Sequence, residues 1–386
     1  MSAADVVVIG GGIVGTAATL FLQRRGLSVI LLERGLIGQQ ASGVSFANVR
    51  RHTRPLHQLP LAQRSYDSWM RLSSLIGDTC EFRQVGNLAV TYGNAQLEHW
   101  EQYVRAARDY GLELEILDPL RLRTRFPYLS KNIAAGLFSP KDGHANPRLL
   151  VPAISRAAER EGARIVLNAE VTSIDRNADR FDVAVGGHAE YRAPIVLIAA
   201  GAWAGKFVAA LDGPVPLFAS GPQLGVTEPL PYRIGPTISV FADRVPERIY
   251  LRQVERGNIV FGGGDRGPAS TETNRASVLP TNTLGQITQL QRLVPALSTA
   301  NVIRVWSGIE GYLPDALPVM GASSRVRGLY YAFGFSGSGF QLGLGVGDVL
   351  SELICTGHTD VPLCQYDIRR FQPATPKSAP GSTRPS

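Results

Sequence analysis

Apolar runs and polar breaks alternate along the chain in a pattern that predicts its elements. The first run, 6–9, consists only of β-branched residues, which is typical of a strand buried on both faces. The next segment, 16–25, carries apolar residues at helical spacing and ends at Gly26, and 28–32 is a second apolar run. The N-terminus is therefore predicted to fold as strand, helix and strand.

The rest of the chain mixes helical and strand patterns. Amphipathic helices are predicted over 59–75, 94–110, 148–161 and 282–294, and a glycine-rich loop precedes a last helix over 342–356. Strand patterns occupy 85–92, 165–185, 195–198, 214–228, 238–264, 302–307 and 329–333.

The order of these patterns predicts two domains that are discontinuous in sequence. Helix and strand alternate as in a nucleotide-binding fold at the start, around 147–213 and at the end, and patterns of antiparallel sheet lie between. The first domain is predicted to comprise 1–84, 147–213 and 304–371, and the second 85–146 and 214–303. The last segment, 372–386, is rich in Pro, Ser and Thr and is predicted to be disordered.

Three glycines at G-x-G-x-x-G spacing follow the first predicted strand. Gly10 permits a tight turn, Gly12 lets backbone N–H groups approach a pyrophosphate, and Gly15 lets helix and strand pack closely. Glu33 ends the second strand, where its carboxylate can accept both hydroxyls of an adenosine ribose and would disfavour a 2′-phosphate. The glycine motif alone is weak evidence, but strand, glycines, helix, strand and acid in this order predict a dinucleotide site.

Composition narrows the function classes. The length of 386 residues suits one large domain or two closely associated ones. The net charge of +7 comes without a basic stripe interleaved with aromatics, so nucleic acid is not an expected partner. No apolar run is long enough to span a bilayer, and the N-terminus lacks the pattern of a cleavable leader, so we expect cytoplasmic residence.

Cysteine and histidine spacing gives no sign of a metal centre. Cys80, Cys355 and Cys364 are widely separated, which excludes a four-thiolate cluster or a C-x-x-C zinc site made by this chain alone. The six histidines show no ligand spacing either. We therefore expect no metal, and free thiols in a reducing compartment.

A dense basic segment, 50–57, follows the first nucleotide-binding pattern. It contains Arg50, Arg51 and Arg54 with two histidines. Such a segment could line the route of an anionic substrate, form a partner interface, or be a solvated loop, and composition does not choose among these.

Five stretches, taken together, resemble one known family. They are the glycine motif ending in Glu33-Arg34, the segment from Ala41 to Asn48, Ala200-Gly201-Ala202-Trp203, the segment from Trp306 through Pro314-Asp315 to Gly321, and Gly334-Phe335-Ser336-Gly337 to Phe340. The chain resembles the D-amino-acid oxidase-like FAD-dependent amine oxidoreductases over nearly its whole length. Within that family, Asn48 to Arg54 and Leu59 to Ser65 are most similar to the catalytic β or B subunits of heteromeric opine oxidases (octopine and nopaline) and of D-hydroxyproline and proline dehydrogenases.

The resemblance implies a fold and a cofactor. The implied fold is α/β, with a Rossmann-like FAD-binding domain and an interleaved α+β substrate domain on an antiparallel sheet, as in D-amino-acid oxidase and glutathione reductase. FAD would be noncovalent, because the cysteine that carries covalent flavin in relatives is absent before Pro314-Asp315. The residues implied to hold FAD are Gly10, Gly12, Ile13, Val14, Gly15, Glu33, Arg34, Ser42, Ser45, Phe46, Ala47, Asn48, Val171, Ala200, Gly201, Trp203, Gly308, Gly334, Ser336, Gly337, Ser338, Gly339, Phe340 and Gln341.

The substrate residues depart from the family pattern. Glycine oxidase-like relatives bind the substrate carboxylate with an arginine near the position of Glu310, and a glutamate cannot do so. Glu310 could instead pair with a cationic group, such as the guanidinium of an arginine-derived opine, or could belong to a structural ion pair. The carboxylate would then fall to Tyr250 and Arg252, or to arginines of 50–54, of which Arg51 is the expected contact. Ser338 replaces a histidine that is frequent in related sequences.

The reaction implied is oxidation of the C–N bond of an opine or related secondary amino acid to an imine, by hydride transfer to flavin N5. Electrons would pass to an α/A-type flavoprotein or NAD(P)H-type partner subunit, with a small iron–sulfur subunit also possible. FMN or an iron–sulfur cluster could be on, or shared with, these partners. Open alternatives are a D-hydroxyproline, proline or glycine dehydrogenase subunit (the last as in hydrogen cyanide synthase), a stand-alone peroxide-forming oxidase, a flavin-binding scaffold subunit and an NAD-linked dehydrogenase.

Overall fold

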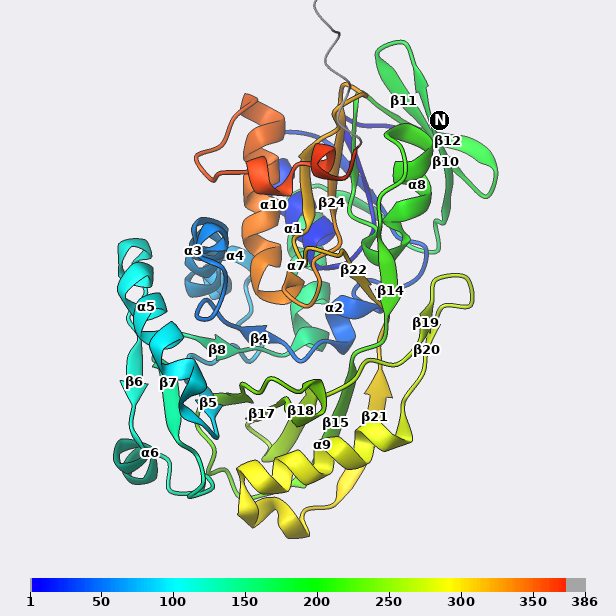
Figure 1. Cartoon of the computed structure of the whole chain (residues 1–386). Helices are drawn as coiled ribbons and strands as arrows, with labels where there is room; N and C mark the ends of the chain where they lie inside the picture. Colours follow the sequence, from blue (N-terminus) through cyan, green and yellow to red (C-terminus); the bar gives the residue numbers. More distant parts are fainter. Residues whose placement is uncertain (1, 373–386) are drawn as a thin grey trace, which may run out of the picture.

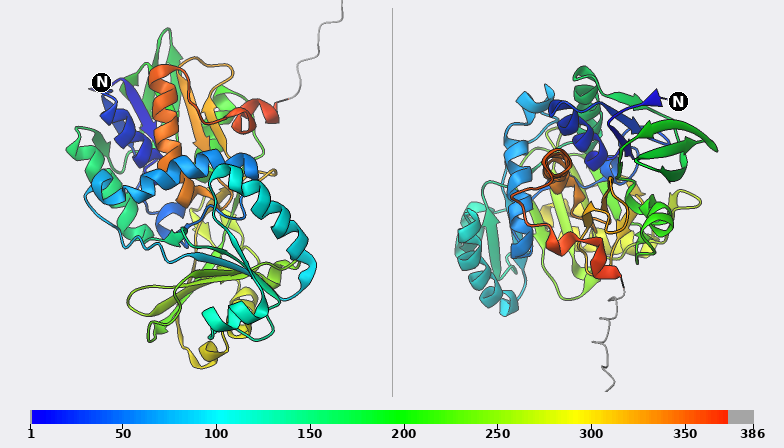
Figure 2. Two further views of the ribbon diagram at one scale, coloured as in Figure 1. Left: turned by 90° about the vertical axis from the view of Figure 1, so that its left-hand side faces the viewer. Right: turned by 90° about the horizontal axis from the view of Figure 1, so that it is seen from above.

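The computed structural model describes residues 2–372 and contains two large sheets. Figure 1 shows the first sheet, with β24, α1, α7 and α10 near it, in the upper part of the view. The second sheet lies below, with α9 on its outer side. In the side view of Figure 2, the helical segment 59–76 lies across the boundary between the two parts.

The first sheet has six strands and is built around the N-terminal apolar run. Its strand β2 is paired in parallel on both sides, and only β23 is antiparallel to its neighbour. All four side chains of β2 are fully buried or nearly so, as the run of β-branched residues predicts. The strand order is β23 (Val319–Ala322), β24 (Leu329–Phe333), β13 (Ile195–Ile198), β2 (Val6–Ile9), β3 (Val29–Leu32) and β9 (Arg164–Val166).

Helices α1 (Ile13–Arg24) and α10 (Gly339–Thr356) pack closely on one face of this sheet. Small residues on α10 permit that approach, because a Cβ on Gly347 would lie 2.6 Å from the backbone of Ala17. The N-terminus of each helix is thereby held near the carboxyl ends of the strands. Helices α3 (Leu59–Met70), α4 (Leu72–Ile76) and α7 (Pro147–Arg160) complete this layer.

A smaller sheet covers the other face. Phe181 and Tyr191 from this sheet pack with Val7 and Val196 of the six-stranded sheet in one apolar cluster. Helix α8 (Ala204–Leu211) contributes Phe207 and Val208 to the same cluster. The strand order of the smaller sheet is β1 (Ser2–Ala3), β12 (His188–Ala193), β11 (Arg180–Val185) and β10 (Val171–Asn177).

The second large sheet has eight strands, and all but one of its pairings are antiparallel. Helix α9 (Pro280–Leu293) places Leu290 and Leu293 in a cluster with Leu251 and Phe261 of this sheet. Its strand order is β21 (Val302–Ser307), β15 (Gln223–Pro229), β18 (Asn258–Gly263), β17 (Ile249–Gln253), β16 (Thr237–Val240), β5 (Asn87–Thr91), β7 (Ala135–Ser139) and β6 (Glu115–Leu117).

Short elements connect the two parts. They include three two-stranded pairs, of which β14 with β22 carries Glu310. The pairs are β4 (Asn48–Val49) with β8 (Gly143–His144), β14 (Phe218–Ser220) with β22 (Glu310–Tyr312), and β19 (Ala269–Ser270) with β20 (Arg275–Ala276), and the remaining α-helices are α2 (Ala41–Val44), α5 (Leu97–Ala107) and α6 (Pro119–Arg125).

Several predicted boundaries differ from the observed ones. The helix predicted over 59–75 is interrupted at Arg71, and that over 94–110 has 3₁₀ turns at both ends of α5. The predicted domain division stays a prediction, and β21 crosses its boundary at 303–304. Of the predicted tail, Gln372 hydrogen-bonds Ser324 at 3.1 Å, and 373–386 lie outside the described residues. Between residues 2 and 372, no helix has both the length and the apolarity needed to cross a membrane; cytoplasmic residence stays a prediction.

Candidate cofactor and substrate site

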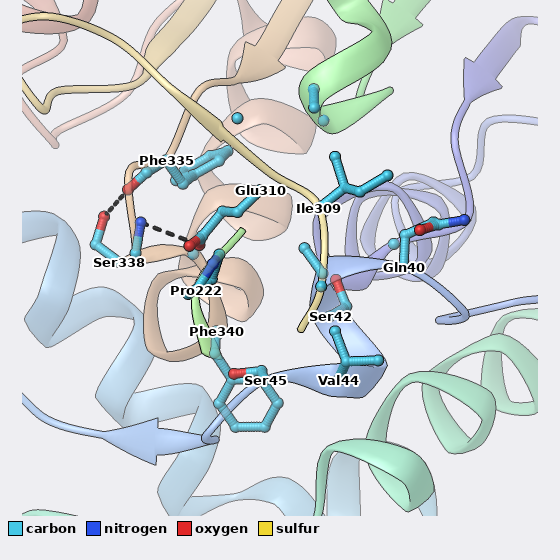
Figure 3. A pocket seen from close by; sticks show the side chains of 18 of the residues that line it. Gln40, Ser42, Val44, Ser45, Pro222, Ile309, Glu310, Phe335, Ser338 and Phe340 are labelled. Atoms are coloured by element: carbon cyan, nitrogen blue, oxygen red, sulfur yellow. Dashed lines mark hydrogen bonds between the residues drawn. The ribbon is translucent and has the colours of Figure 1, made fainter. Parts of the chain in front are cut away.

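A cavity of about 1110 Å³ lies where the two parts of the molecule meet. Its walls come from the carboxyl end of β2, from the segment 33–54, from β16 and β17, and from β22 and the start of α10. Figure 3 shows part of this lining, with Ser42, Val44 and Ser45 on one side and Glu310 and Ser338 on the other. Segments that are far apart in the sequence therefore form one cavity.

The glycine motif forms one end of the cavity through close backbone contacts. Gly10 has a φ of 111°, and a Cβ there would lie 2.5 Å from the Ala199 carbonyl oxygen. A Cβ on Gly15 would lie 1.9 Å from the Gly10 carbonyl oxygen. Gly15 does not line the cavity, so its contribution is this helix–strand contact. Both glycines are needed for steric reasons, as the motif predicts.

Glu33 lines the same end, and its carboxylate already has two donors. Its Oε2 accepts the Gly11 N–H at 2.6 Å, and its Oε1 accepts the Gly35 N–H at 2.8 Å. Because each carboxylate oxygen has two acceptor sites, one on each oxygen remains for a ribose hydroxyl. The carboxylate is thus held in a fixed orientation by the loop that it helps to close.

The residues present fit an adenine dinucleotide. The glycine turn brings bare backbone to the cavity, Glu33 offers acceptors, and Arg34 stacks 3.9 Å from the ring centroid of Trp203 at the edge. The predicted cofactor residues that line the cavity are Gly10, Gly12, Ile13, Val14, Glu33, Arg34, Ser42, Ser45, Phe46, Ala47, Asn48, Val171, Ala200, Gly201, Trp203, Gly308, Gly334, Gly337, Ser338, Gly339, Phe340 and Gln341.

Ser336 is a predicted cofactor residue that the structure does not bring to the cavity. It has a φ of 50°, and its hydroxyl accepts the Leu313 N–H at 3.1 Å and donates to the Gly334 carbonyl at 3.2 Å. Its side chain holds the loop 334–338 in shape instead. The next N–H, that of Gly337, donates to Glu310 Oε1 at 3.0 Å (Figure 3).

Glu310, Tyr312, Tyr250 and Arg266 lie together in the cavity wall. Glu310 Oε2 accepts the Tyr312 hydroxyl at 2.5 Å, and the Arg266 guanidinium lies 4.0 Å from the centroid of the Tyr312 ring. Burial raises the pKa of Glu310, opposed by the Tyr312 hydroxyl, the Arg266 charge and the Gly337 N–H. Burial and the Glu310 charge raise the pKa of Tyr250. Sequence reasoning missed Tyr312 and Arg266, because only the fold brings β18 and β22 together.

Arg252 and Arg51 were expected to contact substrate, but neither lines the cavity. Arg252 Nε donates to the Phe46 carbonyl at 2.8 Å, and its Nη1 lies 3.2 Å from His144 Nδ1. Burial lowers the pKa of Arg252 to about 10. Arg252 thus supports the segment that lines the cavity from behind, because β17 directs alternate side chains to opposite faces.

Arg51 points into a buried polar group below the cavity. Its Nε lies 3.5 Å from Asp142 Oδ1, and its guanidinium lies over the Tyr66 ring at 3.6 Å. His52 Nδ1 lies 2.9 Å from Asp142 Oδ2. Burial alone would raise the pKa of Asp142, but the hydrogen bond from His52 and the charges of His52 and Arg51 bring it below its usual value. We call Arg51, His52 and Asp142 the buried ionic group.

Arg50 and Arg54 are the arginines of this segment that line the cavity. Among the described residues, no carboxylate lies within 4.0 Å of either guanidinium. Arg54 Nε donates to the Arg50 carbonyl at 2.9 Å, and burial together with the Arg50 charge lowers the pKa of Arg54 to about 9. The sequence indicated the basic segment, but the alternation of its side chains selects Arg50 and Arg54 rather than Arg51.

Comparisons with known proteins agree with this site. The family described as "FAD dependent oxidoreductase" (DAO) matches residues 5–353. Human mitochondrial sarcosine dehydrogenase is 28% identical over 96% of the chain, and the B subunit of opine oxidase from Rhizobium meliloti is 25% identical over 95%. The chain spans 42% of the human relative's length and 97% of the bacterial one's. The crystal structure of L-proline dehydrogenase from P. horikoshii superposes with a TM-score of 0.89 at 26% identity, covering 96% of this chain and 98% of that one.

These matches confirm the predicted fold class and FAD as the cofactor. They also extend from the glycine motif to α10, which is the span that encloses the cavity. The chain belongs to the FAD-dependent oxidoreductase (DAO) family.

Proposed function

We propose that the chain is the substrate-oxidising subunit of a dehydrogenase that converts the C–N bond of an opine, or of a related secondary amino acid, to an imine. One observation carries this proposal. A single cavity continues from the dinucleotide end at Gly10 and Glu33 to a polar end at Tyr250 and Glu310. A small amino acid bound at the polar end would therefore meet the cofactor without crossing bulk water.

FAD, when bound, supplies the hydride acceptor for the α-carbon of the substrate. The chain contributes binding and orientation. Backbone at Gly10 and Gly12 and the carboxylate of Glu33 would hold the dinucleotide half, and the segment from Ser45 to Asn48 would run beside the rest of the cofactor. Because hydride transfer needs a close and correctly directed approach, much of the catalysis would come from such positioning.

Arg50, Arg54 and Tyr250 would bind the substrate carboxylate. Buried guanidiniums without a nearby carboxylate are costly, and an anionic ligand in the cavity would offset that cost. Tyr250 adds a hydroxyl donor from β17, and its ring is fixed edge-on against Phe46 with centroids 4.5 Å apart. This assignment replaces the expected contacts with Arg51 and Arg252.

Electrons would pass from this chain to a partner subunit, as the name of its relative, an opine oxidase B subunit, suggests for that protein. The chain has only three cysteines, too few to hold a four-thiolate cluster by itself. The partner is expected to be a flavoprotein or NAD(P)H-type subunit, with a small iron–sulfur subunit or FMN possible. Direct reaction with oxygen is the competing outcome.

A proline-type substrate is a second candidate. It is favoured by the superposition on L-proline dehydrogenase, which covers nearly all of both chains. A ring imino acid and an opine share a secondary amine and an α-carboxylate, so both fit the polar end as described.

The test is flavin bleaching without oxygen. The chain is expressed with its neighbouring genes, and octopine, nopaline, D-hydroxyproline, L-proline, sarcosine and glycine are added in turn. We expect an opine or a proline-type compound to bleach the visible flavin band, while lactate, which has a hydroxyl in place of the amine, does not.

Three outcomes decide among the alternatives. Peroxide production by the isolated chain in air would identify a stand-alone oxidase. Protein that holds FAD but is bleached by no amine, with or without its partners, would indicate a scaffold subunit. Purified protein without flavin would contradict the proposal altogether.

A further inference from the structure

We propose that Glu310 binds the positively charged nitrogen of the substrate and takes up its proton. This inference rests on the proposed function, and it assigns the one buried carboxylate at the polar end of the cavity. It also replaces the expected pairing with a distal guanidinium, because the interaction would be with the reacting nitrogen itself.

The carboxylate of Glu310 is held in place by two donors. The Gly337 N–H reaches Oε1 at 3.0 Å and the Tyr312 hydroxyl reaches Oε2 at 2.5 Å. Each oxygen keeps a second acceptor site, so the carboxylate can receive one further donor without losing these bonds. Figure 3 shows Glu310 on the side of the cavity formed by β22 and the start of α10.

Glu310 lacks a counter-ion. Among the described residues, no arginine, lysine or histidine nitrogen lies within 4.0 Å of its carboxylate. Asp142, the buried acid of the ionic group, has both Arg51 and His52 within that distance. A buried carboxylate without a partner cation is unfavourable, and a cationic ligand in the cavity would supply the missing charge.

The groups that face Glu310 come from three elements. Tyr312 lies on the same strand, Tyr250 comes from β17, and Arg266 comes from the loop after β18. Of these only Arg266 is a cation, and it stacks on the Tyr312 ring rather than forming an ion pair with Glu310. The surroundings therefore offer hydrogen bonds to the carboxylate and little opposing charge.

The proton transfer is balanced by simple chemistry. A secondary amino acid carries an ammonium group at neutral pH, and it must lose one proton before its nitrogen lone pair can assist loss of the α-hydrogen. One N–H bond of the ammonium breaks, an O–H bond forms on Glu310, and the pair becomes a neutral amine beside a carboxylic acid. Because burial raises the pKa of Glu310 toward that of an ammonium, this transfer is less unfavourable than it would be to an exposed carboxylate.

The first test separates charge from shape with two ligands that cannot be oxidised. α-Methylproline has a secondary ammonium but no α-hydrogen, and its tetrahydrofuran analogue has an ether oxygen in place of that nitrogen. Affinities for the flavin-loaded protein are measured by calorimetry. We expect Glu310→Gln, which keeps the shape of the side chain, to weaken the amine at least about tenfold while leaving the ether unchanged or tighter.

The second test follows the proton during reduction. For Glu310→Gln we expect the anaerobic bleaching rate near neutral pH to fall about 10²- to 10⁴-fold, the range for loss of a positioned base. The rate should recover as the pH rises toward the pKa of the free amine, because solution then supplies the neutral form. A defect that is equal at every pH would contradict the role in proton transfer.

Tyr312→Phe provides an independent variant that keeps Glu310. Loss of the hydroxyl donor should raise the pKa of Glu310, so the acid limb of amine binding should move to higher pH while ether binding is unchanged. Equal weakening of amine and ether by Glu310→Gln, or no effect on either, would overturn the inference and leave the proposed function standing. Wild-type protein that binds neither ligand and is bleached by no amine would overturn both.

Discussion

Neighbouring arginines of one short segment have opposite surroundings. Arg51 is paired with Asp142 below the cavity, whereas Arg50 and Arg54 face the cavity without a carboxylate within 4.0 Å among the described residues. All three were equivalent in the sequence pattern of the segment 50–57. The difference between them separates a structural role from a ligand-binding role.

The contrast follows from where counter-charges are placed. A buried charge needs either a permanent partner, which adds to folding stability, or a partner that arrives with the ligand, which adds to binding. The buried ionic group supplies the first kind, and the cavity arginines await the second. Glu310 repeats the second arrangement with the opposite sign of charge.

The largest expected effect is on the paired side of the comparison. Asp142→Asn leaves the buried Arg51 guanidinium without its carboxylate, which should lower the free energy of unfolding by about 3–5 kcal/mol. Denaturant unfolding at a fixed excess of FAD measures it. Asp179→Asn, at an exposed acid, is the control and should change stability by less than about 0.5 kcal/mol. Equal effects of the two variants would contradict the structural role of Asp142.

Acid sensitivity should follow from His144, which is buried against Arg252. Burial, with the charges of Arg252 and Arg83, lowers the pKa of His144 to about 3. The unfolded chain takes up a proton near its ordinary pKa and the folded chain does not, so stability should fall as the pH drops from about 6.5 toward 3, by up to about 1.4 kcal/mol per pH unit.

The variant His144→Asn should flatten this dependence while keeping an acceptor for Arg252. Unfolding free energies measured from neutral pH down to about pH 4.5, above the range where most carboxylates protonate, give the slope. His188→Asn, at an exposed histidine, should leave the slope unchanged. A slope that His144→Asn does not alter would show that other groups cause the acid sensitivity.

Binding should respond on the unpaired side. Arg54→Met removes a buried charge without a nearby carboxylate, so we expect stability to be unchanged or increased. The KM for the carboxylate substrate should rise about 10- to 100-fold, equivalent to about 1.5–3 kcal/mol for a charged hydrogen bond. Arg51→Met should show the reverse, with lower stability and little change in KM. Steady-state kinetics on both variants, with exposed Arg105→Met as the control, would test the comparison directly.

The smallest effect is expected where an ion pair is exposed. Arg24 and Glu161 are 2.9 Å apart with side chains 32% and 42% exposed. Glu161→Gln should change the free energy of unfolding by no more than about 1 kcal/mol. A loss as large as that from Asp142→Asn would show that burial does not explain the contrast.

Much of the cofactor end could be predicted from the sequence. The order of strand, Gly10, Gly12, Gly15, helix and Glu33 encodes its contacts locally, because residues within about thirty positions form that turn and its neighbours. The structure refined the role of Glu33, whose oxygens also accept N–H groups from the loops beside it. It also assigned Gly15 to packing rather than to the lining.

The substrate end was predicted less well, and Arg51, Arg252 and Ser336 show why. Each lies within one or two residues of the cavity lining but directs its side chain elsewhere. Strand alternation and loop geometry set that direction, and a one-residue difference reverses it. The family resemblance identified the segments correctly but could not choose the side chain within each segment.

The sequence by itself determined the fold class, the family and the dinucleotide edge, since these depend on local periodicity and on glycines that no other residue can replace. Tertiary structure alone decided which charges are paired. Asp142 meets Arg51 across about ninety positions, and Glu310 meets Gly337 and Tyr312 but no cation within 4.0 Å among the described residues. Pairing is decided by distance and burial in space, because a charge is neutralised by what folding brings beside it and not by what precedes it in the chain.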